Sequence, residues 1–239
     1  MKKLIALILS AMMLLGCCAF AEEPAAPANL LPNPNFETGD LNGQWTTCYA
    51  YHLFGNDIPY VELVPGHNSE YAVLVKSANA VEGKPESDMW CSAIAIDVTE
   101  IMKAAGNGEY FFKAYVKLAD ENAFATCDAW LQIYDQNRED KYTSLQNWKL
   151  ESNTPVDGMG WTQIGLDADG NNKSFQVWWN SGNDNTGKAP TQQAGAREIL
   201  VDDFEFTHAI LWVTCGVADG QAISYILDDA EFFVVPVAK

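Results

Sequence analysis

The sequence predicts an all-β protein, a β-sandwich built from two antiparallel sheets. Short segments in which apolar and polar residues alternate recur along most of the chain. Alternation with a period of two is the pattern of a strand that buries one face. Gly, Pro, Asn and Asp cluster between these segments, as they do in turns. Many short strands with turns between them and almost no helix are typical of a sandwich.

Each predicted strand shows this alternation or an apolar run of strand length. In chain order the predicted strands are Trp45–His52, Tyr71–Lys76, Cys91–Asp97, Tyr110–Leu118, Cys127–Tyr134, Ser174–Trp179, Phe204–Thr207, Ala209–Val217 and Ile223–Val235. One helix is expected at Thr99–Ala105, capped by Thr99 and ended by Gly106 and Gly108. Polar segments rich in turn residues predict a hairpin or loop at Asp135–Gln146 and loops at Asn153–Gly160 and Asn180–Ala196.

The N-terminus has the pattern of an export signal. Lys2 and Lys3 precede the apolar run Leu4–Gly16, and a small-x-small site ends at Ala21. The apolar run is shorter than the roughly 20 residues that a membrane-spanning helix needs. A lipobox-like sequence before Cys17 makes a lipid anchor there the alternative. We therefore expect a signal peptide at 1–21, a short tether at 22–28 and a single β-sandwich domain at 29–239, in a protein that is secreted or displayed on the cell surface.

The chain is strongly acidic, with a formal net charge of −18 at pH 7. Removal of the signal would take away two lysines and no acids, which makes the mature chain more negative still. Such a charge opposes binding to nucleic acid or to an anionic membrane. Neutral polysaccharides fit better as partners, although an acidic surface also serves solubility alone.

Four cysteines remain after the predicted cleavage site: Cys48, Cys91, Cys127 and Cys215. Export permits disulfides, and four cysteines allow three pairings. Buried thiols are the alternative. The spacings are long and contain no Cys-x-x-Cys pair, which argues against a zinc site.

Two stretches near the chain ends carry a family resemblance. Asn29–Trp45 reads NLLPNPNFETGDLNGQW, and Ser224–Phe233 reads SYILDDAEFF. Together they resemble the opening and closing signatures of a group of bacterial carbohydrate-binding modules, families four, nine, sixteen and twenty-two. That group shares a galactose-binding-like jelly roll, so the resemblance narrows the sandwich to that fold. It also implies that the concave face of one sheet, or the loops at its rim, binds sugar.

The same resemblance implies a structural calcium ion near the two chain ends. The matching acids are Glu37 and Asp229, with Asp228 as the alternative to Asp229. Calcium takes six to eight oxygen ligands, so backbone carbonyls near Asn35 and Gly39 would have to join. The alternative is that the acids only accept backbone hydrogen bonds.

Sugar recognition needs flat aromatic rings for the C–H faces of a pyranose and planar polar groups for its hydroxyls. Strand faces with this mixture carry Asp128, Trp130, Gln132 and Tyr134, then Lys113 and Tyr115, and finally Trp212. The opposite side of each strand is apolar and should form the core. The alternative is that a second layer covers this face, which would make Trp130 and Trp212 ordinary core residues. Trp178 and Trp179 are adjacent in a strand, so one of them should be buried and the other open.

The sequence has no pattern that indicates catalysis. It contains no Gly-x-Ser-x-Gly, no His-Glu-x-x-His and no phosphate loop, and its three histidines lack metal-ligand spacing. No carboxylate pair is singled out for glycoside hydrolysis. We predict a non-catalytic module that binds a neutral polysaccharide such as β-glucan or xylan. The alternatives are a structural or adhesive module that binds a protein or cell-wall component, and a small glycoside hydrolase.

Overall fold

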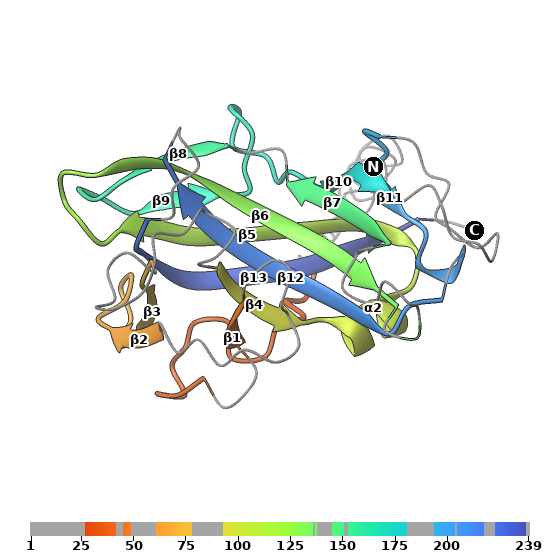
Figure 1. The fold of residues 1–239 in the computed structure, drawn as a ribbon, viewed down its shortest axis with the longest axis horizontal. Helices are drawn as coiled ribbons and strands as arrows, with labels where there is room; N and C mark the ends of the chain where they lie inside the picture. The colour runs from red at the N-terminus through yellow and green to blue at the C-terminus, as the bar shows by residue number, and fades with distance from the viewer. Residues whose placement is uncertain are drawn as a thin grey trace, which may run out of the picture.

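Two antiparallel sheets lie face to face and run along the long axis of the molecule (Figure 1). The structure is a computed structural model that describes residues 27–41, 45–48, 61–77, 93–135, 137, 145–150, 153–180, 194–203, 205–217 and 223–237. The predicted signal peptide and most of the tether lie outside these ranges. Within them the chain is a jelly-roll β-sandwich, which confirms the predicted fold class.

Sheet A takes its strands from the whole length of the chain. In spatial order it contains β1 (Trp45–Cys48), β4 (Ala93–Asp97), β12 (His208–Gly216), β6 (Phe124–Tyr134), β7 (Gln146–Leu150) and β10 (Phe175–Asn180), with β8 (Thr154–Asp157) also paired to β6. Sheet B contains β11 (Glu198–Ile199), β5 (Gly108–Leu118), β13 (Tyr225–Pro236), β3 (Ala72–Val75) and β2 (Val61–Val64), with β9 (Thr162–Ile164) also paired to β5.

The core lies between the sheets and follows from strand alternation. In β5 every second residue is buried, from Tyr110 to Leu118, while the residues between them are partly exposed. In β6 the apolar set Cys127, Ala129, Leu131 and Ile133 faces the same core, as predicted. Trp148 of β7 is also fully buried in this core.

The predicted helix is confirmed as α2 (Thr99–Ala105), but the prediction of its cap is wrong. Val98 occupies the cap position and makes no side-chain cap hydrogen bond. The Thr99 hydroxyl instead accepts a hydrogen bond of 2.8 Å from the backbone N–H of Ala209. This bond ties the start of α2 to β12. Gly106 ends the helix with a positive φ of 74°, a conformation that suits glycine.

The opening stretch lies along the closing strand, although about 200 residues separate them in sequence. Leu30 N–H donates to the Phe232 carbonyl at 2.8 Å, and Ala230 N–H donates to the Pro34 carbonyl at 2.8 Å. The Asn29 side chain donates to the Ala230 carbonyl and accepts from the Phe232 N–H. The two stretches that carry the family resemblance therefore form one structural unit.

Several sequence predictions need correction. Short strands were missed at β2, β7, β8, β9 and β11, and part of Asn153–Gly160, predicted as a loop, forms β8. Phe204–Thr207 was predicted as a strand, but residues 205–207 form none. The second half of the predicted strand Trp45–His52 and most of the loops Asp135–Gln146 and Asn180–Ala196 lie outside the described residues. None of the described helices is long and apolar enough to cross a membrane.

Candidate functional site

The outer face of sheet A brings together five of the predicted ligand residues. Asp128, Trp130, Gln132 and Tyr134 alternate with the core residues of β6, so all four project away from the sandwich interior. Register then places Trp212 of β12 directly opposite Trp130. A small second apolar cluster forms on this face from Ala93, Ala95, Trp130, Tyr134, Ile210 and Trp212.

Three tryptophans form the centre of this face. The rings of Trp130 and Trp212 stack with centroids 5.7 Å apart and planes within 9°. Trp178 meets Trp130 edge to face, with centroids 6.1 Å apart and planes at 87°. Both are favourable aromatic geometries. Trp178 is 56% exposed, whereas Trp130 is 4% exposed and Trp212 is fully buried.

This burial corrects the predicted platform. The sequence leaves two interpretations of Trp130 and Trp212 open, a platform for a ligand or ordinary core residues, and the burial of both rings agrees with the second. The Trp212 indole N–H donates at 2.9 Å to the Gln132 side-chain oxygen, and the Tyr134 hydroxyl donates to the same oxygen at 2.6 Å. These three side chains form an internal network beneath the surface. The open ring of the cluster is that of Trp178.

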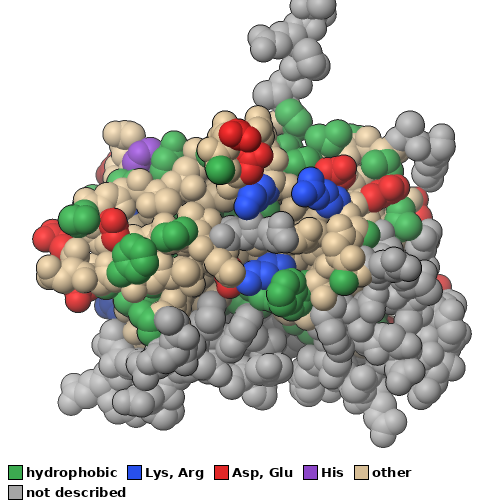
Figure 2. Space-filling model, turned by 90° about the horizontal axis from the view of Figure 1, so that it is seen from above, with side chains coloured by type: hydrophobic (Ala, Val, Ile, Leu, Met, Phe, Trp, Pro, Cys, Tyr) green, Lys and Arg blue, Asp and Glu red, His purple; other side chains and the backbone are tan. Residues whose placement is uncertain are grey.

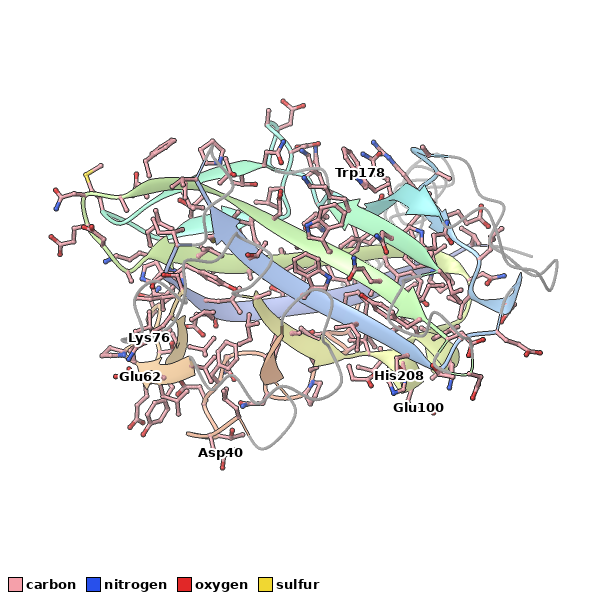
Figure 3. The ribbon with its side chains drawn as sticks, viewed as in Figure 1. Asp40, Glu62, Lys76, Glu100, Trp178 and His208 are labelled. Carbon is pink, nitrogen blue, oxygen red and sulfur yellow. The ribbon has the colours of Figure 1, made fainter. Side chains whose placement is uncertain are left out.

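A β-bulge aims Trp178 at this cluster. In the pairing of β10 with β7, Val177 opposes Trp148 and Trp179 opposes Asn147, so Trp178 is the extra residue between them. Bulges re-aim side chains and are common beside binding sites. Trp178 projects at the edge of the sandwich beside β10 (Figure 3). Seen from the side of β8 and β10, lysine and arginine side chains lie beside hydrophobic ones on the described surface (Figure 2).

Lys149 of β7 links the aromatic cluster to a buried acid. Its ammonium nitrogen lies 5.0 Å from the ring centroid of Trp130 and 5.3 Å from that of Trp178, distances at which a cation attracts an aromatic face. The same nitrogen lies 3.1 Å from Asp128 Oδ2, and both side chains are largely buried. Lys149 was not predicted as a site residue, because the short strand β7 was not recognised.

Two buried oxygens on this face have no hydrogen-bond partner within the described part of the chain. They are Asp128 Oδ1 and Asn147 Oδ1. Asn147 lies opposite Gln132 in the pairing of β6 with β7. It is two residues before Lys149, on the same face of β7. A buried acceptor without a donor is costly, but neither oxygen is accessible to a ligand in this structure. The outer face of sheet A thus combines an exposed indole and a lysine with two buried acceptors.

Lys113 and Tyr115 do not belong to this face. Both lie on β5 of sheet B, on the opposite layer of the sandwich. Lys113 forms an ion pair of 3.1 Å with Glu231, and the Tyr115 ring stacks on His67 at 3.9 Å. The separate strand faces that the sequence offers as ligand surfaces therefore lie on different sheets. Alternation within a strand cannot show which sheet that strand joins.

Two of the predicted calcium ligands, Glu37 and Asp229, contact the loop 66–71. Glu37 Oε1 accepts the Tyr71 N–H at 2.7 Å, and Asp229 Oδ2 lies 3.2 Å from His67 Nδ1. Asn35 and Gly39 belong to the same turn as Glu37, and Gly39 has a φ of 73°. Asp40, also in that turn, lies at the opposite edge of the molecule from Trp178 (Figure 3). The calcium prediction therefore concerns a place remote from the aromatic cluster.

Asp228, the alternative ligand, is fully buried and accepts three hydrogen bonds. Its carboxylate accepts hydrogen bonds from His67 N–H, the Ser69 hydroxyl and Asp229 N–H. Burial raises the pKa of Asp228 above its usual value, against the effect of these donors. The described residues contain no group of three or more His, Cys, Asp and Glu side chains that could hold a metal. Calcium here would therefore need backbone oxygens beside Glu37 and Asp229, a hard oxygen donor set of the kind it prefers.

No protein-family model and no curated protein sequence matches the chain. Solved structures share its fold. The CBM22-1 xylan-binding domain of Paenibacillus barcinonensis Xyn10C aligns with a TM-score of 0.53 and 15% identity, over 89% of this chain and 98% of that domain. The CBM22-2 domain of the same protein aligns with a TM-score of 0.50 and 11% identity, over 84% of this chain and 98% of that domain. The similarity is one of fold: the chain is a jelly-roll β-sandwich like these two domains.

Proposed function

We propose that this chain is a non-catalytic carbohydrate-binding module that binds a neutral polysaccharide, xylan or a β-glucan, at the outer face of sheet A. One observation carries the proposal: the exposed Trp178 ring lies against Trp130 and Lys149, and Lys149 reaches the buried Asp128. A pyranose face would stack on the indole of Trp178. Its hydroxyls would form hydrogen bonds with polar side chains around that ring.

Two further observations support the polysaccharide class. The structures that share the fold include two domains described as xylan-binding. The net charge of −18 favours a neutral ligand over an anionic one. A single module of this kind should bind weakly, with Kd of about 10⁻³ to 10⁻⁵ M. The predicted signal peptide and the alternative lipid anchor at Cys17 would place the module outside the cell or on its surface.

The Trp178→Ala variant tests the proposal. We expect native affinity electrophoresis in gels containing xylan, β-glucan or mannan to show retardation of the wild-type protein by one polysaccharide. Trp178→Ala should weaken that binding by about 30-fold, since the loss of a central aromatic contact costs about 2 kcal/mol.

Phe124→Ala is the matched control. Phe124 is an exposed aromatic residue on the same strand as Trp130, 66% exposed and about 20 Å from it along β6. The Phe124→Ala variant should be retarded by the polysaccharide as strongly as the wild-type protein. Equal loss in both variants would show that general surface hydrophobicity, and not the aromatic cluster, retards the protein.

The burial of Trp130 and Trp212 favours a second candidate, a structural or adhesive module that binds a protein or cell-wall component. In that case the stacked pair only stabilises the sheet, and Trp178 contacts a macromolecular partner. The same gels separate the two candidates. Retardation by no polysaccharide, with the protein folded, would favour the adhesive function.

We also propose a structural calcium ion held by Glu37, Asp229 and backbone oxygens near Asn35 and Gly39. Calcium at about 100 times its Kd should stabilise the fold by about 2.7 kcal/mol. This corresponds to a rise in melting temperature of about 5–10 °C between chelator and calcium. Glu37→Gln should remove that rise. Glu100→Gln, the same change at an exposed position of α2, should keep it. A melting temperature that is insensitive to calcium in the wild type would contradict the site.

A further inference from the structure

Two cysteines lie directly opposite each other in the core face of sheet A. Cys127 of β6 and Cys215 of β12 are register partners in the antiparallel pairing of these strands. Both are fully buried, both belong to the main core cluster, and both are thiols in this structure. Their side chains therefore project from neighbouring strands into the same part of the sandwich interior.

Backbone hydrogen bonds show whether Cys127 and Cys215 form a hydrogen-bonded or a non-hydrogen-bonded antiparallel pair. Successive residues of a central antiparallel strand direct their N–H and C=O groups alternately to its two neighbours. The Ala209 carbonyl accepts a hydrogen bond from Val98 N–H at 2.8 Å. The backbone N–H and C=O groups of Ala209 therefore point toward the side of β12 on which β4 lies. Cys215 lies six residues further along β12, and the register with β6 has no shift between them. The backbone N–H and C=O groups of Cys215 therefore point to the same side as those of Ala209. Its carbonyl accepts from Ile223 N–H at 3.2 Å.

Cys215 and Cys127 therefore form a non-hydrogen-bonded pair, the closer of the two antiparallel pair types. Opposite Cα atoms in such pairs are about 4.5 Å apart. Disulfides join residues whose Cα atoms are about 4.4–6.8 Å apart. The backbone of β6 and β12 thus already has a separation that a disulfide can bridge.

We propose that Cys127 and Cys215 form a cross-strand disulfide when the chain folds in an oxidising compartment. One thiolate attacks a disulfide of an external oxidant, such as oxidised glutathione or a disulfide oxidoreductase, and displaces one of its sulfurs as a thiolate. The second cysteine thiolate then attacks this mixed disulfide and releases the other oxidant sulfur. The two cysteines lose two electrons and two protons, and the oxidant is reduced to its two thiols. The proposal rests on the predicted export and is independent of polysaccharide binding.

The surroundings of the pair imply that the bond forms during folding. Burial and the adjacent Cys127 thiol raise the pKa of the Cys215 thiol well above its usual range. A fully buried thiol with a raised pKa is seldom a thiolate and is out of reach of an oxidant. The disulfide would therefore have to form before the core-facing side chains of β6 and β12 are buried.

Disulfide mapping after oxidative refolding tests the proposal. The chain without its predicted signal peptide, residues 22–239, is denatured and reduced, then refolded in a mixture of reduced and oxidised glutathione. It is alkylated at acidic pH in denaturant without further reduction, digested and analysed by mass spectrometry. We expect the peptides that contain Cys127 and Cys215 to be joined. Alkylation of both peptides, or a bond from either one to Cys48 or Cys91, would overturn the proposal.

Thermal unfolding provides a second measurement. The bond would close a loop of about 90 residues and should raise the melting temperature by about 10 °C relative to protein refolded in excess dithiothreitol. The Cys127→Ala/Cys215→Ala variant should lose this difference, apart from any contribution of Cys48 and Cys91. Identical melting temperatures of the oxidised and reduced wild type would count against the bond. If the variant does not fold, the disulfide map still decides.

Discussion

Replacing Lys149 by methionine should lower the free energy of unfolding by about 3–5 kcal/mol, the usual cost of removing one partner of a buried ion pair. Asp128 is nearly fully buried, and its Oδ2 lies 3.1 Å from the Lys149 ammonium group. Its other oxygen has no hydrogen-bond partner in the described part of the chain. Methionine keeps the length and most of the apolar contacts of lysine but leaves a buried carboxylate without a counter-ion. Urea denaturation of the two proteins measures the difference.

Lys103→Met is a closely matched control. Lys103 forms an ion pair with Glu100 at the same distance, 3.1 Å, but the two side chains are 45% and 87% exposed. An exposed pair within one helix contributes only about 0.3–0.5 kcal/mol. The double variant Lys149→Met/Asp128→Asn should recover part of the loss, because it removes the unpaired charge. Equal effects of Lys149→Met and Lys103→Met would contradict a buried pair beneath the tryptophans.

Gly165→Ala should lower the free energy of unfolding by about 2–5 kcal/mol. Gly165 follows β9 and has a φ of +88°, which costs a residue with a Cβ about 1–2 kcal/mol. An added Cβ would also lie 2.0 Å from the Phe112 carbonyl oxygen and 2.9 Å from Lys113 Cα. Both contacts are with the backbone of β5, so relief would require β5 and β9 to move apart. Forcing extra atoms into such a site costs about 1–3 kcal/mol more.

Gly170→Ala separates the conformational cost of a positive φ from the cost of the steric clash with β5. Gly170 has a similar φ of +83°, but no atom lies within 4 Å of the position that its Cβ would take. It sits in a polar turn in which Asp167 accepts the Asp169 and Asn171 N–H groups. Only the conformational cost of about 1–2 kcal/mol should appear there. If chemical denaturation shows similar decreases in the free energy of unfolding for both variants, β5 and β9 move apart at Gly165 at little energetic cost.

Long strands and the helix were predictable because their signals are local. In β5, β6 and β12 a period of two runs over nine or more residues, so the core faces of these strands follow from sequence alone. Three of the five missed strands are very short: β11 has two residues, β9 three and β8 four, and β8 contains a proline. Two to four residues do not show a period. Such strands form because a long neighbour, β5 or β6, offers backbone partners.

The site was predictable only where it lies within one strand. Asp128, Trp130, Gln132 and Tyr134 share a face because they alternate in β6, and sequence alone predicts that correctly. Lys149 was missed because its position depends on a short strand, and the sequence could not show which of Trp178 and Trp179 is open because that depends on a bulge. Tyr115 and Lys113 have the same local pattern as the β6 residues but lie in the other sheet.

By itself, the sequence determined the β-sandwich, the core faces of its long strands, the helix and the face of β6 that carries Trp130. These features follow from side-chain periodicity, which is a property of neighbouring residues in one segment. Only the tertiary structure decided that Trp212 is buried, that Trp178 is the exposed ring, that Lys149 pairs with Asp128 and that Cys127 opposes Cys215. Each depends on strand order and register between segments distant in sequence, which are set by the packing of the whole sandwich and not by any local pattern.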